Sequence, residues 1–140
     1  MSDALPPLRL FLDRSTQSKR FIAAVRELVD DVVTINDRYG TKAAEDIPDI
    51  RWIAEASAEE RVLIGADRNI LRNRLERHAI CRSSARYVVF SNSNMPVRRM
   101  AELFEQHLPD IHELAMTPGP WAHRIAQHGI GRLSLNCDDL

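Results

Sequence analysis

The chain has 140 residues, of which 44% are hydrophobic and 28% charged, with a formal net charge of −1. This length favours a single domain over residues 1–140, and the near-neutral charge excludes a globally basic nucleic-acid binder. No apolar run has the length of a membrane helix and no signal-peptide pattern opens the sequence, so we expect a cytoplasmic protein with no membrane partner. Cys81 and Cys137 lack metal-like spacing, and we expect free thiols.

Short apolar segments alternate with segments of helical periodicity along the chain. In chain order, we expect a strand at 8–12, a helix from Ser15 or Thr16 to Val29, a strand at 31–35, a polar loop at 36–48, a helix at 49–60, a strand at 62–66, a helix at 68–79, a strand at 87–90 and a helix at 95–114 with Pro109 as a candidate break. Residues 119–140 are a candidate hairpin extension that pivots at Gly129-Ile130-Gly131. The alternation predicts an α/β fold with a mainly parallel sheet of about four to five strands, flanked by helices.

Three aspartates occupy positions where an open α/β sheet forms its sites. Asp13 and Asp67 each end an apolar strand, and Asp49 opens the helix that precedes the third strand. With right-handed crossovers, the ends of parallel strands lie at one edge of the sheet, so Asp13 and Asp67 are expected to converge. The polar segment before Asp49 can carry it to the same edge, and it contains Asp37, Glu45 and Asp46 as candidates for a fourth carboxylate.

Clustered carboxylates remain ionised when a cation compensates their charge. Oxygen ligands without histidine or thiolate suit Mg²⁺ or Mn²⁺, ions that orient water and stabilise charge during phosphodiester hydrolysis. Helix capping is the alternative role for each aspartate, and the spacing alone does not separate the two roles.

A basic segment follows the third predicted strand. Between Arg68 and Arg86 the chain carries six arginines and one acidic residue, Glu76. Arg68 and Arg72 are one helical turn apart and come directly after Asp67, so they are candidates for binding RNA phosphates. The alternatives are a solvated arginine-rich helix face and pairing with acidic groups of an inhibitor protein.

Two segments resemble the PIN-like domain family, the fold of the VapC-type toxin ribonucleases. These are FLDRS, with its strand-ending aspartate, and DIRWIAEASAEERVLIGADRN, which is similar to the family pattern D-x-x-I-A-x-x-A … L-x-T-x-D. The resemblance covers roughly Leu8 to Phe90. It implies a three-layer PIN-like fold in which Asp13, Asp49 and Asp67 are catalytic metal ligands.

The sequence also departs from the family pattern. The longer helical insertion that usually carries a further glutamate is short here, so Glu45 or Asp46 is the candidate substitute. Gly65-Ala66 replaces the usual threonine-containing pair before Asp67, and the segment from Gly119 onward is typical of a compact variant.

The resemblance implies a Mg²⁺- or Mn²⁺-dependent endoribonuclease, the toxin of a toxin–antitoxin pair. The implied partners are an RNA substrate, a cognate antitoxin and a second copy of the chain as a homodimer. The alternative is a catalytically inactive PIN-like module that binds a protein partner or RNA.

Overall fold

The computed structural model describes residues 6–92 and 94–139, without the side chains of Arg68 and Asp139. The strands are β1 (Arg9–Leu12), β2 (Asp31–Thr34), β3 (Val62–Gly65), β4 (Arg86–Phe90), β5 (Trp121–Ala126) and β6 (Gly129–Leu133). The α-helices are α1 (Lys19–Leu28), α2 (Ile35–Tyr39), α3 (Thr41–Ala44), α4 (Asp49–Ala58), α5 (Arg74–Arg82) and α6 (Val97–Ala115). Three 3₁₀ turns complete the chain: η1 (Arg14–Thr16), η2 (Arg68–Leu71) and η3 (Cys137–Asp139).

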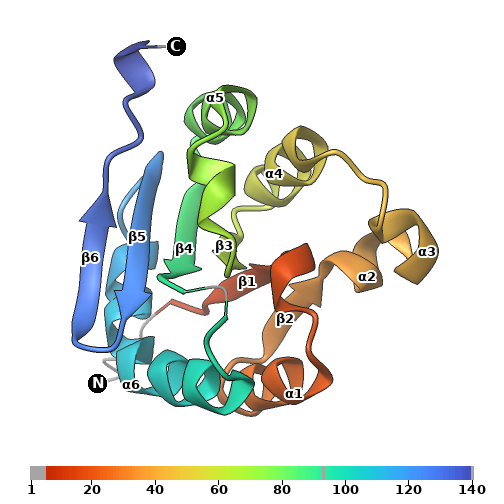
Figure 1. Ribbon diagram of the computed structural model, residues 1–140, viewed down its shortest axis with the longest axis vertical. Coiled ribbons are helices and arrows are strands. Elements are labelled where there is room, and N and C mark those ends of the chain that lie inside the picture. Colours follow the sequence, from red (N-terminus) through yellow and green to blue (C-terminus); the bar gives the residue numbers. More distant parts are fainter. Residues whose placement is uncertain (1–5, 93, 140) are drawn as a thin grey trace.

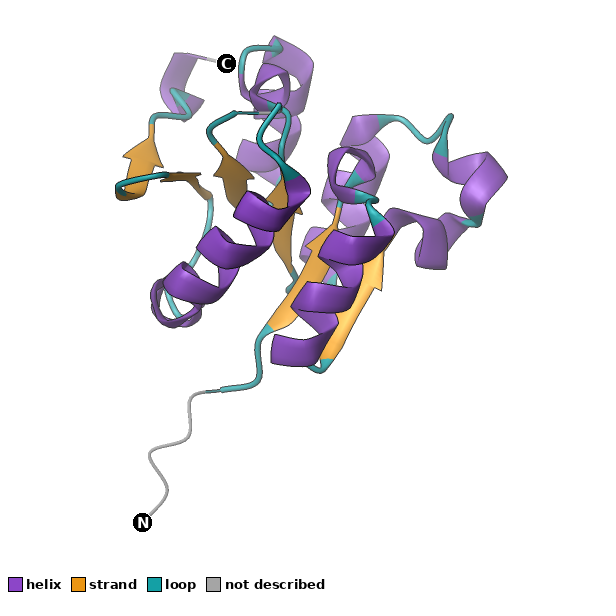
Figure 2. Cartoon of the chain, turned by 60° about the horizontal axis from the view of Figure 1, so that its bottom comes forward, coloured by secondary structure: helices purple, strands orange, loops and turns teal. Residues whose placement is uncertain are grey.

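A central sheet separates two layers of helices. Its strand order is β2-β1-β3-β4-β5-β6, and only the β5–β6 pair is antiparallel. Helices α1 and α6 lie side by side on one face, as Figure 2 shows, and α4 and α5 cover the other face (Figure 1). The carboxyl ends of β1, β3 and β4 therefore meet at one edge of the sheet. The predicted mainly parallel three-layer fold is confirmed, with six strands in place of four to five.

Each helix layer has its own hydrophobic core against the sheet. On the α1–α6 side, Phe21 packs edge-on against Phe90 and Phe104, with ring centroids 5.6 and 6.3 Å away. On the α4–α5 side, Trp52 is 1% exposed and stacks on Phe11. The central strands β1, β3 and β4 are buried from both sides, which explains why their sequences are nearly continuous apolar runs.

The segment predicted as a polar loop, residues 36–48, instead contains α2 and α3. The first of these helices begins with a reciprocal cap, in which the Thr34 hydroxyl accepts from the Asp37 N–H and the Asp37 carboxylate accepts from the Thr34 N–H. Similarly, α1 is capped by Ser18 rather than by Ser15 or Thr16.

Two predicted helix boundaries also differ from the structure. The helix expected over 68–79 is divided into η2 and α5, because the Asn73 side chain accepts from the N–H groups of Leu75 and Glu76 and caps a new helix there. Conversely, α6 continues through Pro109 without a break. Packing of its apolar face, including Phe104 and Ile111, on the sheet outweighs the hydrogen bond that a proline lacks. Within residues 119–139, β5 and β6 form an antiparallel pair whose turn precedes Gly129.

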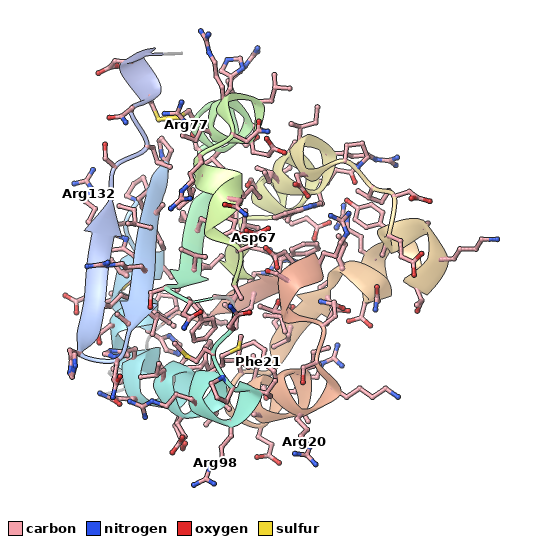
Figure 3. The ribbon with its side chains drawn as sticks, in the orientation of Figure 1. Arg20, Phe21, Asp67, Arg77, Arg98 and Arg132 are labelled. Atoms are coloured by element: carbon pink, nitrogen blue, oxygen red, sulfur yellow. A yellow bond between two sulfur atoms is a disulfide. The ribbon has the colours of Figure 1, made fainter. Side chains whose placement is uncertain are left out.

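The cysteines correct the expectation of free thiols. Cys81, at the end of α5, forms a disulfide with Cys137 in η3, and their Cα atoms are 5.8 Å apart (Figure 3). The separation of 56 residues gave no spacing signal, because the fold alone brings the two together. Among the helices that the structure describes, none is both long and apolar enough to cross a membrane.

Candidate active site at the carboxyl edge of the sheet

Asp13 directly follows β1 and is 3% exposed. Its Oδ1 accepts hydrogen bonds from the N–H and the hydroxyl of Ser15, and its Oδ2 accepts from the Tyr87 hydroxyl at 2.6 Å. Burial raises its pKa from 3.8 to about 6, against the lowering effect of these bonds, and the charge of Asp49 raises it further. Asp13 therefore caps η1, and it is also a buried acid whose surroundings disfavour its charged form.

The donors to Asp13 are themselves fixed by neighbouring strands. The Ser15 hydroxyl accepts from the Ala66 N–H at 2.8 Å, immediately after β3. Tyr87 lies in β4, is fully buried and has a pKa raised well above 10 by burial and by the nearby Asp13 charge. It therefore remains a neutral hydroxyl donor at physiological pH.

Asp49 is the first residue of α4, and Pro48 occupies the N-cap position. Its side chain makes no capping bond; instead its Oδ1 accepts from Trp52 Nε1 at 2.9 Å and from Arg14 Nη1 at 3.2 Å. Arg14 also donates to the carbonyls of Ala44 and Ile47 and so ties the loop before α4 to the end of β1. Capping therefore does not explain Asp49.

Asp67 follows β3 and is exposed. Its Oδ1 accepts from the Asn69 N–H at 2.9 Å, so it caps η2. In Figure 3 it lies at the strand ends, in front of the α4–α5 layer. Its charge contributes to the raised pKa of Tyr87, the residue whose hydroxyl donates to Asp13. Capping and participation in a site are both compatible with this position.

Glu76 is a site residue that the sequence did not reveal. It lies on the first turn of α5, and its Oε2 is buried without a hydrogen-bond partner among the described residues. Burial raises its pKa, and the adjacent Asp49 carboxylate raises it further. The available signal was its position as the only acid between Arg68 and Arg86. Its placement depends on the helix break at Asn73.

One cavity of about 390 Å³ joins these groups. It is lined by Asp13, Arg14, Ser15, Asp49, Trp52, Asp67, Asn69, Ile70, Asn73, Glu76 and Tyr87. The three predicted aspartates thus share a cavity, and its fourth carboxyl group belongs to Glu76.

The other predicted site residues do not line this cavity. Glu45 and Asp46 are exposed beyond α3, and Glu45 lines a neighbouring pocket that also includes Asp49 and Glu76, so either as the fourth group stays a prediction. Arg72 is exposed at the end of η2, and the Arg68 side chain lies outside the described part of the structure. Arg98, on α6, points away from the site on the α1–α6 side (Figure 3).

The donor set of the cavity suits a hard divalent cation. Its acidic groups are all carboxylates, and burial raises the pKa of two of them, Asp13 and Glu76. Across residues 6–92 and 94–139, however, no group of three or more His, Cys, Asp or Glu side chains is arranged to hold a metal ion. Cation binding would require the carboxylates to approach one another, and Asp49 to share its charge between the ion and Arg14.

Comparison with known proteins gives a family. The family model described as "PIN like domain" matches residues 8–92, which include all four cavity carboxyl groups. The chain is also similar to a protein of Mycobacterium tuberculosis named "Putative ribonuclease VapC45", with 25% identity over 124 residues that cover 89% of this chain and 90% of the relative. No solved structure matches the chain. The family match spans more than half of the chain and the fold agrees with it, so this protein belongs to the PIN-like domain family.

Proposed function

We propose that this protein is a Mg²⁺- or Mn²⁺-dependent endoribonuclease that hydrolyses RNA phosphodiester bonds, and that it is the toxin of a toxin–antitoxin pair. The observation that carries the proposal is the convergence of four carboxyl groups around one cavity at the carboxyl edge of the sheet. Membership of the PIN-like family supports it, as does the similarity to a relative named as a VapC ribonuclease.

In this proposal Asp13, Asp49 and Asp67 hold the cation, and Glu76 is the fourth acidic group. When bound, a divalent cation would orient a water molecule and stabilise the negative charge that develops on the scissile phosphate. The chain's own residues fix the acids: Ser15 and Tyr87 orient Asp13, and Trp52 and Arg14 orient Asp49.

Substrate and partner binding follow from the charge around the cavity. Arg68 and Arg72 lie just beyond Asp67 in the sequence and are our candidates for contacts with the phosphates flanking the cleaved bond. An antitoxin would inhibit most directly by covering the acidic cavity. A homodimer remains a prediction from the family resemblance.

The ion pair between Arg14 and Asp49 favours a second candidate function. It partly neutralises one acid of the set, as expected for a PIN-like module that has lost activity and binds RNA or a protein partner. The two candidates differ in whether the cavity binds a cation and whether RNA is cut.

Asp67→Asn tests the proposal, because asparagine retains the capping bond to η2 while removing the charge. We expect wild type to bind Mn²⁺ in a calorimetric titration and to cleave structured RNA only when Mn²⁺ or Mg²⁺ is present. Asp67→Asn should lower the cleavage rate about 100-fold, corresponding to the loss of about 3 kcal/mol of transition-state stabilisation.

Asp30→Asn is the matched control, since Asp30 is an exposed acid at the opposite edge of the sheet. It should cleave like wild type. A folded wild-type protein that neither binds Mn²⁺ nor cleaves RNA would favour the inactive module. For the toxin assignment, expression of wild type should arrest growth, expression of Asp67→Asn should not, and co-expression of a small neighbouring gene should restore growth.

A further inference from the structure

Tyr87 reaches Asp13 through a space that only a glycine leaves open. Tyr87 pairs with Leu63 in the β3–β4 register, so Gly65 is its diagonal neighbour on the same face of the sheet. A Cβ atom on residue 65 would lie 2.2 Å from the Tyr87 hydroxyl oxygen and 2.4 Å from Asp13 Oδ2. The hydroxyl therefore occupies the place where the side chain of residue 65 would begin.

Space, rather than backbone conformation, requires this glycine. Gly65 is not among the residues with positive φ, so its backbone would accept any side chain. The third close atom, Tyr87 Cζ, lies 3.0 Å from the ideal Cβ position, and it belongs to a fully buried ring that cannot easily move away. Gly65, Tyr87 and Asp13 thus form one interlocked unit across three strands.

The interlocked unit determines how Asp13 is presented. Its Oδ2 is held by Tyr87 from β4, and its Oδ1 by Ser15, which is in turn bound to the backbone after β3. An ionised carboxylate has about four lone-pair sites, two on each oxygen; the two bonds from Ser15 use those of Oδ1, and the bond from Tyr87 leaves one site free on Oδ2. The carboxylate that lines the cavity is consequently fixed in rotation while it can still accept a cation.

We propose that Tyr87 is a positioning residue of the site, and that Gly65 is required because it admits the Tyr87 hydroxyl to Asp13 Oδ2. The proposal rests on the proposed function in that the ion received by Asp13 is the cation invoked there. Hydrogen-bond partners that orient a metal ligand commonly contribute 10–100-fold to metal affinity.

The decisive experiment measures Mn²⁺ affinity of the full chain by calorimetry, without RNA. Tyr87→Phe should weaken Mn²⁺ binding by about 10–100-fold while the protein still unfolds cooperatively. Tyr39→Phe is the matched control, because the Tyr39 hydroxyl also donates to a carboxylate, that of Glu55, but outside the cavity. It should leave Mn²⁺ affinity unchanged.

A second variant tests the space at residue 65. Gly65→Ala would place a Cβ atom 2.2 Å from the Tyr87 hydroxyl oxygen and 2.4 Å from Asp13 Oδ2, so the bond between these two groups could not keep its geometry. Gly65→Ala should therefore weaken Mn²⁺ binding at least as much as Tyr87→Phe does, and it should lower the melting temperature through steric conflict.

The outcomes separate this proposal from the nuclease proposal. Unchanged Mn²⁺ affinity in Tyr87→Phe or in Gly65→Ala would overturn the positioning role even if wild type cleaves RNA. A loss of Mn²⁺ affinity in both variants, with Tyr39→Phe unchanged, supports the role even if no RNA is cut, which would count against the nuclease proposal alone. If wild type binds no Mn²⁺, both proposals fail.

Discussion

Asp31 and Glu59 at the amino edge of the sheet are paired with arginines, whereas Asp13 and Glu76 at the carboxyl edge have neutral donors or no described partner. At the amino edge, Asp31 lies 3.1 Å from Arg9 Nε and 2.7 Å from Arg61 Nη1. At the carboxyl edge, Asp13 is held by hydroxyl and amide groups, and Glu76 Oε2 finds no hydrogen-bond partner within the described residues.

The pKa directions at the two edges are opposite. The hydrogen bond from Arg61 is the main reason why the pKa of Asp31 is lowered, while burial raises the pKa of Asp13 and of Glu76. The charge of Asp31 therefore stabilises the folded state, and the charges of Asp13 and Glu76 oppose it. Acids that the fold keeps at a cost to stability are typical of functional sites, so the difference singles out Asp13 and Glu76 as functional candidates.

The largest effect that would test this comparison is on the pH dependence of stability. Between about pH 4 and pH 6 the unfolded chain has released the Asp13 proton while the folded protein still holds it, so stability falls as pH rises through this window. A pKa that rises from 3.8 to about 6 on folding corresponds to at most about 3 kcal/mol of destabilisation above pH 6. Asp13→Asn should remove this fall and raise the free energy of unfolding at pH 7, measured by urea denaturation in EDTA.

Asp31→Asn is the control of opposite sign. Because folding lowers the pKa of Asp31, its stabilising contribution is present above the unfolded value of 3.8 and is lost as pH falls below it. Its replacement should destabilise the protein at pH 7 and have little effect in strong acid. Parallel pH–stability curves for wild type and Asp13→Asn would contradict the contrast between the two edges.

A smaller effect is expected from the amino edge alone. The Arg61 side chain is 8% exposed; it donates to Asp31, to Glu59 and to the buried carbonyl of Leu10. Arg61→Met keeps the aliphatic packing but leaves these acceptors without their donor, and it should lower the free energy of unfolding by about 2 kcal/mol. The value is modest because Asp31 and Glu59 are 41% and 35% exposed and retain other arginine partners.

Arg51→Met provides the comparison for this prediction. Arg51 is 57% exposed and pairs with Glu55 one turn away on α4, so its loss should cost less than about 0.5 kcal/mol. Neither variant should change Mn²⁺ binding or RNA cleavage. A loss of cleavage in folded Arg61→Met would mean that the two edges are coupled.

The sequence predicts the sheet well because its strands are buried on both faces. Continuous apolar runs such as Val62–Gly65 and Arg86–Phe90 have few alternative structures, and parallel connection then brings Asp13 and Asp67 to one edge. Asp49 is found for the same reason, since it opens a helix that packs on this sheet. These inferences need only periodicity and the handedness of the connections.

Side-chain competition for the backbone was harder to predict. The residues of the Thr34–Asp37 cap and of the Asn73 cap are visible in the sequence. Threonine, aspartate and asparagine are favoured in turns as well as at helix N-caps, however, so their presence alone does not predict a helix start. The inclusion of Glu76 in the site depends on the Asn73 cap, because the break turns the first turn of α5 towards Asp49. The Cys81–Cys137 disulfide depends on the packing of the C-terminal segment against α5, which no local pattern encodes.

The smallest effect that we predict concerns Glu76, the carboxyl-edge acid that the sequence did not reveal. Glu76→Gln keeps the shape of the side chain and removes its charge, so it should lower Mn²⁺ affinity and RNA cleavage about tenfold, equivalent to about 1.4 kcal/mol. The melting temperature of the metal-free protein should be unchanged or slightly higher, because the repulsion between Glu76 and Asp49 is relieved. Glu45→Gln alters an exposed acid outside the main cavity and should change neither quantity. If Glu45→Gln instead impairs cleavage and Glu76→Gln does not, the fourth acid comes from the loop before α4. In that case a partly buried carboxyl group with a raised pKa, such as that of Glu76, is not enough to identify a functional acid at this edge.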